Sequence, residues 1–372
     1  MSLFDVRGSQ PLAADAYVYL IMNDAGRSLS SLRKAKEEEE ASPPLPPVTL
    51  SLPEVKDLAW QMLNAVHYLH AAGFVHRDIK TDNVLMKRLP APEMGGSRTW
   101  RLQLCDLGLA RSRRVEGTGG GGGGGGAAAL PYATAGTANV VTASYKPMEL
   151  LGQYGHDTRY DASKVDVFSA GCVLAELFMM VEGGGSNRVS GSVFDPRRQG
   201  VARPTWAREE QIKMIVGVLG KPSDVDLAWL KDADPNAYSG VMHALGGVGS
   251  AILGGWFGGG AAAAAPEPTL HGIIPAAPPD GLELLRAMFA LRPDARASAR
   301  EAMDNPYFAD LLAGPAGGAY RAELAATEEA ARKVGEPPEL HTPEFNDRTC
   351  RTLSASAMRD LLEAELAKWR GK

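Results

Sequence analysis

Residues 76–83 gather several side chains that can act together in one chemical step. The run reads HRDIKTDN, and it holds Asp78, Lys80 and Asn83 within a single short segment. Phosphoryl transfer needs an acceptor that orients the attacking hydroxyl, a cation near the phosphate and an oxygen ligand for Mg²⁺. On one tight loop, these three residue types predict that chemistry.

A second polar segment offers another oxygen ligand. Asp106 follows the apolar, β-prone run 102–105 and precedes Leu107 and Gly108. A carboxylate at the end of a strand, beside a flexible glycine, can reach a metal ion. Charged residues inside apolar runs cost free energy unless they are paired or functional. Residues 74–86 and 102–110 are therefore the predicted site.

The elements that must position these residues follow from the hydrophobic pattern. Ser51 and Glu54 have the spacing of a capping box, and apolar residues then recur at helical spacing up to a stop at Gly73. Residues 164–181 are apolar nearly all round, which predicts a fully buried helix. Residues 17–22 predict a strand, and residues 88–99 predict a hairpin loop.

Composition excludes several classes of protein. The net charge of the 372 residues is −5, so the basic footprint of a nucleic-acid binder is absent and no nucleic-acid partner is expected. Three widely spaced cysteines exclude a disulfide framework and indicate a reducing compartment. No signal peptide and no apolar run long enough for a membrane span is predicted. The excess of glycine is local and concentrates in the run 119–126.

Together these motifs resemble the protein kinase superfamily. HRDIKTDN matches the catalytic-loop signature HRDxxxxN, and DLG at 106–108 matches DFG with Leu for Phe. Residues 140–149 resemble the end of the activation segment, 166–171 the buried helix of the C-lobe, and 292–296 the DPxxR segment. Lysine at position 80 is the serine/threonine pattern. The segment VVTASYKPMELLG resembles the group of mitogen-activated and cyclin-dependent kinases.

The resemblance implies roles at the matching positions. Asp78 is the implied catalytic base, Lys80 the contact to the γ-phosphate, and Asn83 and Asp106 are the implied Mg²⁺ ligands. The implied ATP-binding residues are Met22 at the gatekeeper position, Asn23, Asp24 and Ala25 in the hinge, and Leu85 under the adenine. The implied structural and regulatory residues are His76, Arg77, Gly108, Thr142, Glu149, Asp166 and Arg296. Among them, Arg77 is expected to meet the activation segment, Asp166 to brace the catalytic loop, and Glu149 to pair with Arg296.

The implied fold is α+β and protein-kinase-like. It has a mainly α-helical C-lobe and a residual hinge strand, with most of the β-rich N-lobe missing. We expect a leader at 1–16, a kinase domain at 17–312 and a helical or disordered tail at 313–372. Inserts are expected near 88–99, 117–136, 183–210 and 236–280.

The N-terminal part departs from the family pattern. The segment before Tyr17 contains no lysine, no glycine-rich loop and no helix of adequate length. Three hypotheses follow: a serine/threonine kinase that is N-terminally incomplete in this sequence, a catalytically impaired pseudokinase that acts as a protein-binding scaffold, or a non-functional fragment. The intact set of Asp78, Lys80, Asn83 and Asp106 favours the first.

The activation segment also departs from the nearest group. The usual Arg-Trp is Ala143-Ser144, and the proline of the APE motif is Met148. A preference for proline after the target residue is therefore in doubt. The expected cofactors are ATP and Mg²⁺, and the expected partners are protein substrates and a regulatory protein. The expected location is the cytoplasm, the nucleus or both.

Overall fold

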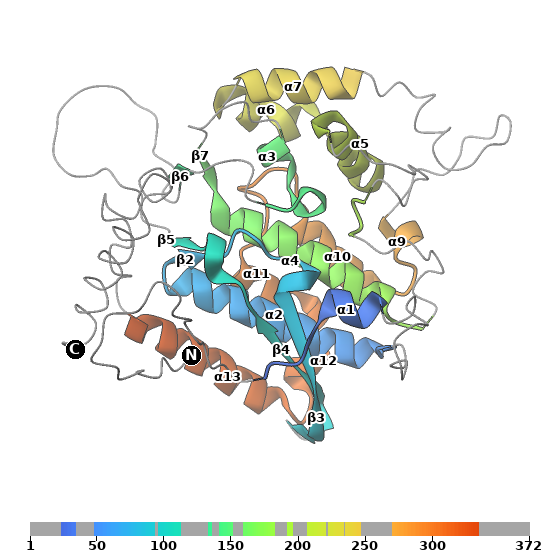
Figure 1. The fold of residues 1–372 in the computed structure, drawn as a ribbon, viewed down its shortest axis with the longest axis vertical. Coiled ribbons are helices and arrows are strands. Elements are labelled where there is room, and N and C mark those ends of the chain that lie inside the picture. Colours follow the sequence, from blue (N-terminus) through green and yellow to red (C-terminus); the bar gives the residue numbers. More distant parts are fainter. Residues whose placement is uncertain are drawn as a thin grey trace, which may run out of the picture.

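A computed structural model describes the chain in several stretches. They are residues 24–34, 48–93, 96–112, 133–135, 141–151, 159–182, 192–195, 207–220, 222–233, 235–246 and 270–334. The predicted strand at 17–22 lies outside the described residues, and so do Met22, Asn23 and the glycine run 119–126. Within the described part, helices dominate and the strands are few (Figure 1).

Two long helices form the centre of the fold. Helix α2 (Leu52–Ala71) begins at the predicted capping box, where the Glu54 carboxylate accepts a hydrogen bond of 2.9 Å from the backbone nitrogen of Ser51. Helix α4 (Ala162–Met179) is buried along almost its whole length, as its apolar composition predicts. Helix α4 packs against α2 and against α10 (Pro279–Met288). These packed helices form the part of the core on which the predicted site is built.

A three-stranded antiparallel sheet lies next to this centre, in the order β1–β3–β4. Its strands are β1 (Arg27–Ser28), β3 (Val84–Glu93) and β4 (Arg98–Leu104). The hairpin predicted at 88–99 exists, but it is mostly strand rather than loop. Arg88 stands opposite Trp100, and an ion pair of 2.6 Å joins Arg101 to Glu93 near the tip. These cross-strand contacts extend the pairing beyond the range that the apolar pattern indicates.

Two short ribbons and the remaining helices complete the described fold. Strand β2 (Phe74–Val75) pairs with β5 (Arg111–Ser112), and β6 (Ala133–Ala135) pairs with β7 (Arg159–Asp161). The other helices are α1 (Leu29–Lys34), α3 (Met148–Leu151), α5 (Arg208–Leu219), α6 (Asp224–Ala233), α7 (Pro235–Gly246), α9 (Leu270–Ile273), α11 (Ala299–Met303), α12 (Ala309–Ala313) and α13 (Gly317–Val334). None of the described helices is both long and apolar enough to cross a membrane.

The last described helix, α13, packs against α2 rather than standing apart (Figure 1). Tyr320 of α13 is fully buried, and its hydroxyl donates a hydrogen bond of 2.8 Å to Asp57 of α2. Glu323 of α13 meets Arg98 of β4 through two bonds of 2.8 and 3.0 Å. The helical segment expected after residue 313 therefore runs as far as Val334, and it contributes Tyr320 to the core.

Candidate active site

The loop between β2 and β3 is held in place by one buried carboxylate of α4. Asp166 of α4 accepts hydrogen bonds from the backbone nitrogens of His76 at 2.8 Å and Arg77 at 2.7 Å. The ring of His70 lies 2.9 Å from the same carboxylate. Arg77 has φ 66°, in the left-handed region, which costs about 1–3 kcal/mol in a residue other than glycine. The bonds to Asp166 hold this conformation in place.

Three polar side chains converge on the carboxylate of Asp78. Lys80 Nζ lies 2.7 Å from Asp78 Oδ2, and Asn83 Nδ2 donates to the same oxygen at 3.0 Å. Thr142, from a distant part of the chain, donates to Asp78 Oδ1 at 3.0 Å. Lys80 also donates to Thr142 Oγ1 at 3.3 Å. The structure therefore brings together the acceptor and the cation predicted from the sequence, and it adds a threonine contact that spacing alone does not reveal.

The two predicted metal ligands lie on adjoining parts of the hairpin. Cys105 N donates to the backbone oxygen of Asn83 at 3.0 Å, so the next residue, Asp106, stands beside Asn83. The amide nitrogen of Asn83 is used by Asp78, which leaves its amide oxygen available. The exposed carboxylate of Asp106 accepts from Gly108 N at 3.3 Å. An amide oxygen and a carboxylate are the hard ligands that Mg²⁺ prefers, so these residues fit the expected cation.

Within the described residues, no three His, Cys, Asp or Glu side chains gather into a ready metal cage. Mg²⁺ is usually held by one or two protein oxygens and completes its shell with water and substrate phosphates. A side chain at Gly108 would place its Cβ 3.1 Å from Asp106 Oδ1. The glycine therefore keeps the space beside this carboxylate open.

The side chains of His76 and Arg77 tie the loop to the segment after β4. The His76 ring lies 3.0 Å from the backbone oxygen of Cys105, and Arg77 Nε donates to the backbone oxygen of Leu109 at 2.7 Å. Burial lowers the pKa of Arg77, while Tyr160 opposes that shift. Burial raises the pKa of the Cys105 thiol, with a further contribution from the Asp106 charge, so this thiol stays protonated at neutral pH.

The expected nucleotide-binding residues that the structure describes lie around β1 and β3. Ser28 stands opposite the half-buried Leu85, and Lys87 Nζ lies 2.8 Å from Asp24 Oδ2. The turn at Gly26, which follows Ala25, has φ 91°, and a Cβ there would stand 2.2 Å from a backbone oxygen of β3. Only glycine permits this approach. Asp24, Ala25 and Leu85 thus come from neighbouring segments.

A buried network that the sequence analysis did not predict lies beneath the loop. The Tyr145 hydroxyl donates to Glu176 Oε1 at 2.6 Å and lies 3.1 Å from Thr81 Oγ1. Arg33 of α1 forms an ion pair with the same glutamate. Burial raises the pKa of Tyr145 to about 12. Glu176 interrupts an otherwise apolar run, and a charge in a buried helix is the sequence signal that could have revealed this network.

The expected pair between Glu149 and Arg296 is present and fully buried. Arg296 Nη1 lies 2.7 Å from Glu149 Oε1, and Nη2 lies 3.1 Å from Oε2. Arg296 Nε also donates to the backbone oxygen of Ala290 at 3.0 Å. This two-pronged geometry fixes helix α3, and with it the end of the segment that carries Thr142.

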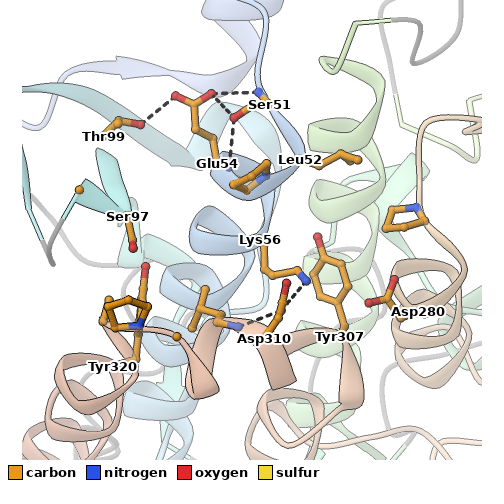
Figure 2. A pocket seen from close by; sticks show the side chains of 17 residues that line it. Ser51, Leu52, Glu54, Lys56, Ser97, Thr99, Asp280, Tyr307, Asp310 and Tyr320 are labelled. Carbon is orange, nitrogen blue, oxygen red and sulfur yellow. Dashed lines mark hydrogen bonds and ion pairs between the residues drawn. The ribbon is translucent and has the colours of Figure 1, made fainter.

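A cavity of about 740 Å³ lies away from these residues (Figure 2). It opens between the first turn of α2, the tip of the β3–β4 hairpin and the start of α13. Inside it, Lys56 Nζ lies 2.6 Å from Asp310 Oδ1 and 4.6 Å from the centre of the Tyr307 ring. Glu54 turns instead toward Ser51 and Thr99 (Figure 2). None of the residues around Asp78 lines this cavity.

Known proteins are similar to this chain over most of its length. The protein kinase domain family matches residues 12–308. Mitogen-activated protein kinase 4 of Oryza sativa subsp. japonica is 26% identical over 258 residues, which are 68% of this chain and 50% of that protein. A probable cyclin-dependent kinase 8 of Dictyostelium discoideum is 27% identical over 306 residues, 80% of this chain and 62% of that protein.

One solved structure, the yeast RNA Pol II CTD kinase CTDK-1 complex, is similar with a TM-score of 0.46 and 21% sequence identity, covering 76% of this chain and 68% of that one. The chain spans about 50% to 62% of the length of the curated relatives named above. The family match covers most of the chain and includes every described residue of the Asp78 cluster. The chain belongs to the protein kinase family.

Proposed function

We propose that this chain is the catalytic part of a serine/threonine protein kinase, which transfers the γ-phosphate of ATP to serine or threonine residues of protein substrates. The observation that carries the proposal is the cluster around Asp78. Thr142, Lys80 and Asn83 all direct polar atoms at this one carboxylate. A set of polar groups so arranged is suited to orient a hydroxyl and to stabilise the charge that develops on a phosphoryl group.

The residues have separate tasks in this proposal. Asp78 orients the substrate hydroxyl and accepts its proton through a carboxylate oxygen. Lys80 places a positive charge near the transferred phosphoryl group, and Thr142 fixes both side chains through its bonds to Asp78 Oδ1 and Lys80 Nζ. Because two backbone bonds hold the loop on Asp166, the side chains are positioned before the substrate arrives.

Asn83 and Asp106 would hold Mg²⁺, which neutralises the phosphate charges of bound ATP. The adenine would lie against Leu85, near Asp24 and Ala25, while the roles of Met22 and Asn23, outside the described residues, stay predictions from the sequence. A regulatory protein partner remains a prediction.

A second candidate function is a protein-binding scaffold that does not transfer phosphate. The substitution pattern in the activation segment favours it, because Ala143, Ser144 and Met148 replace residues typical of the nearest kinases. Both candidates share the fold, and they differ in whether Asp78 performs chemistry.

The deciding experiment compares the chain with its Asp78→Asn variant. Transfer of labelled γ-phosphate to a generic protein substrate is measured together with the Mg²⁺-dependent binding of ATP. We expect slow transfer that Asp78→Asn abolishes, and ATP binding that Asp106→Ala weakens while Asp78→Asn retains it. Transfer that is the same with Asp78→Asn, or absent at every enzyme concentration, would overturn the proposal. ATP binding without Asp78-dependent transfer would favour the scaffold.

A further inference from the structure

The buried side chain of Thr81 lies between two residues of the proposed site. Lys80 precedes it, and Asn83 ends the single turn of 3₁₀ helix that Thr81 begins. The backbone nitrogen of Asn83 donates to the backbone oxygen of Lys80 at 3.0 Å, which closes this turn. Thr81 is 3% exposed, and among the described residues its hydroxyl makes one hydrogen bond, to Tyr145. A shift of the Thr81 side chain would therefore move Lys80 and Asn83 as well.

The hydrogen bond between Thr81 and Tyr145 has a fixed direction. Tyr145 Oη lies 2.6 Å from Glu176 Oε1 and 3.1 Å from Thr81 Oγ1. Arg33 forms an ion pair with Glu176, so this carboxylate stays ionised and can only accept hydrogen bonds. The one phenolic proton of Tyr145 therefore goes to Glu176, and burial, which raises the pKa of Tyr145 to about 12, keeps that proton in place. Tyr145 Oη must then accept the proton of the Thr81 hydroxyl.

The acceptor of the Thr81 hydroxyl is itself held by helix α4 at two points. The side chain of Tyr145 donates to Glu176, and its backbone oxygen accepts a hydrogen bond of 3.0 Å from Ser169 Oγ, one helical stretch earlier. Tyr145 is 5% exposed and Glu176 is fully buried. Hydrogen bonds shielded from water in this way are electrostatically stronger than exposed ones. The Thr81 hydroxyl thus joins the loop to an acceptor that is already fixed in the core.

We propose that Thr81 is a positioning residue of the transfer reaction, whose hydroxyl, donated to Tyr145, holds Lys80 and Asn83 in the geometry of the Asp78 cluster. This inference rests on the proposed function and adds to its site a residue that makes no hydrogen bond to Asp78. A displacement of about 1 Å can lower a reaction rate about 100-fold when it affects a reacting group. A buried anchor next to Lys80 therefore affects turnover although it performs no chemistry.

The first test separates the hydroxyl of Thr81 from its packing. Valine has a similar shape but offers no proton, and serine keeps the hydroxyl without the methyl group. In the transfer assay, we expect Thr81→Val to lower kcat about tenfold, as for one lost hydrogen bond, with the KM for ATP unchanged. Thr81→Ser should retain most of the rate. A kcat of Thr81→Val equal to that of the unaltered chain would overturn the inference.

A matched control and a double variant test whether Thr81 acts through Tyr145. The control is Thr99→Val, which removes a hydroxyl that donates to Glu54 at 2.8 Å in the β3–β4 hairpin and should leave kcat unchanged. Tyr145→Phe removes the acceptor of the Thr81 hydroxyl, so kcat should fall by at least tenfold. Adding Thr81→Val to Tyr145→Phe should cause little further loss, because the bond is already absent. Losses that multiply in the double variant would overturn the inference.

Hydrogen exchange gives a readout that does not depend on transfer. The amide proton of Asn83, which is bonded to the Lys80 backbone oxygen, reports opening of the turn that Thr81 begins. It should exchange about tenfold faster in Thr81→Val than in the unaltered chain or in Thr81→Ser. Exchange at the same rate in all three chains would overturn the inference. Thr81-dependent exchange without any Asp78-dependent transfer would overturn the proposed function, while the anchoring of the loop by Thr81 would stand.

Discussion

Two buried aspartates organise two different regions of this molecule. Asp166, in α4, receives the backbone nitrogens of His76 and Arg77 and so holds the catalytic loop. Asp57, in α2, receives side chains instead: Gln61 at 2.8 Å and, through its other oxygen, Arg98 at 3.2 Å. Both carboxylates are almost inaccessible to solvent, with exposures of 1% and 2%.

The difference lies in what each carboxylate fixes. Asp166 fixes the path of the main chain, and its donors are present whatever side chains the loop carries. Asp57 fixes the relation between elements, because Arg98 and Tyr320 belong to β4 and α13. Burial raises the pKa of Asp57, and its partners oppose that shift. The first arrangement fixes the backbone of the catalytic loop. The second, which we call the Asp57 joint, connects α2, β4 and α13 through the side chains of Asp57, Arg98 and Tyr320.

The largest effect is expected from Asp166→Ala. This change leaves two buried backbone nitrogens without an acceptor, which costs about 3–5 kcal/mol in the free energy of unfolding. The measurement is urea denaturation, with proteolysis of the loop as a second readout. The matched control is Asp161→Ala, which removes the cap of the same helix and should cost about 1 kcal/mol. Equal losses of stability for the two variants would show that the bonds from the loop to Asp166 stabilise the fold no more than an ordinary helix cap does.

A smaller effect is expected at the Asp57 joint. Arg98→Met leaves the Asp57 carboxylate buried with only neutral donors, and we expect a loss of about 2–4 kcal/mol. The double variant Asp57→Asn with Arg98→Met should recover part of that loss, which a double-mutant cycle measures. Arg101→Met, on the exposed face of the same strand, should change stability by less than about 1 kcal/mol. If the losses of the two single variants simply add in the double variant, Asp57 and Arg98 do not stabilise the fold through their interaction.

The smallest effect is on the pH dependence of stability, and it concerns His67 of α2, whose Nε2 lies 3.5 Å from Glu328 Oε1 of α13. Burial lowers the pKa of His67 below its usual 6.5, although Glu328 opposes the shift, and the nearby Arg300 and His70 lower it further. The unfolded chain therefore binds more protons than the folded chain between 6.5 and the lowered value. This contribution to stability is complete above pH 6.5 and decreases as the pH falls through that window.

His67→Gln should accordingly flatten the fall in melting temperature between pH 7 and pH 5, a range chosen to bracket the usual histidine value. His271→Gln, which changes an exposed histidine on α9, is the control and should leave the slope as it was. A slope that is unaltered by His67→Gln would assign the acid sensitivity to other groups.

The parts that could be predicted from the sequence are those with a local cause. The capping box at Ser51 and the apolar run of α4 predicted two central helices, and both are confirmed. The resemblance to protein kinases is confirmed by the family match. The spacing of Asp78, Lys80 and Asn83 predicted one cluster, because a loop of that length keeps its members close together.

Apart from the contacts implied by the resemblance, such as the Glu149–Arg296 pair, contacts between distant parts of the chain were not predicted. Thr142 reaches Asp78 across 64 positions, and Arg98 reaches Glu323 across 225. Such pairs depend on how whole elements pack, and neither periodicity nor motif spacing contains that information. The extended hairpin beyond Arg88 was missed for a related reason: cross-strand pairs, rather than an apolar pattern, hold it in place.

The position of α13 has a consequence for the order in which the protein forms during translation. Tyr320 and Asp57, which share a hydrogen bond, lie 263 positions apart. At about 5–20 residues per second, the ribosome needs roughly 13 to 50 seconds to make the intervening chain. Throughout that time the surface of α2 around Asp57 is not yet covered by α13. Helix α2 therefore becomes covered only after α13 has been made, and until then its exposed surface favours aggregation and binding by chaperones.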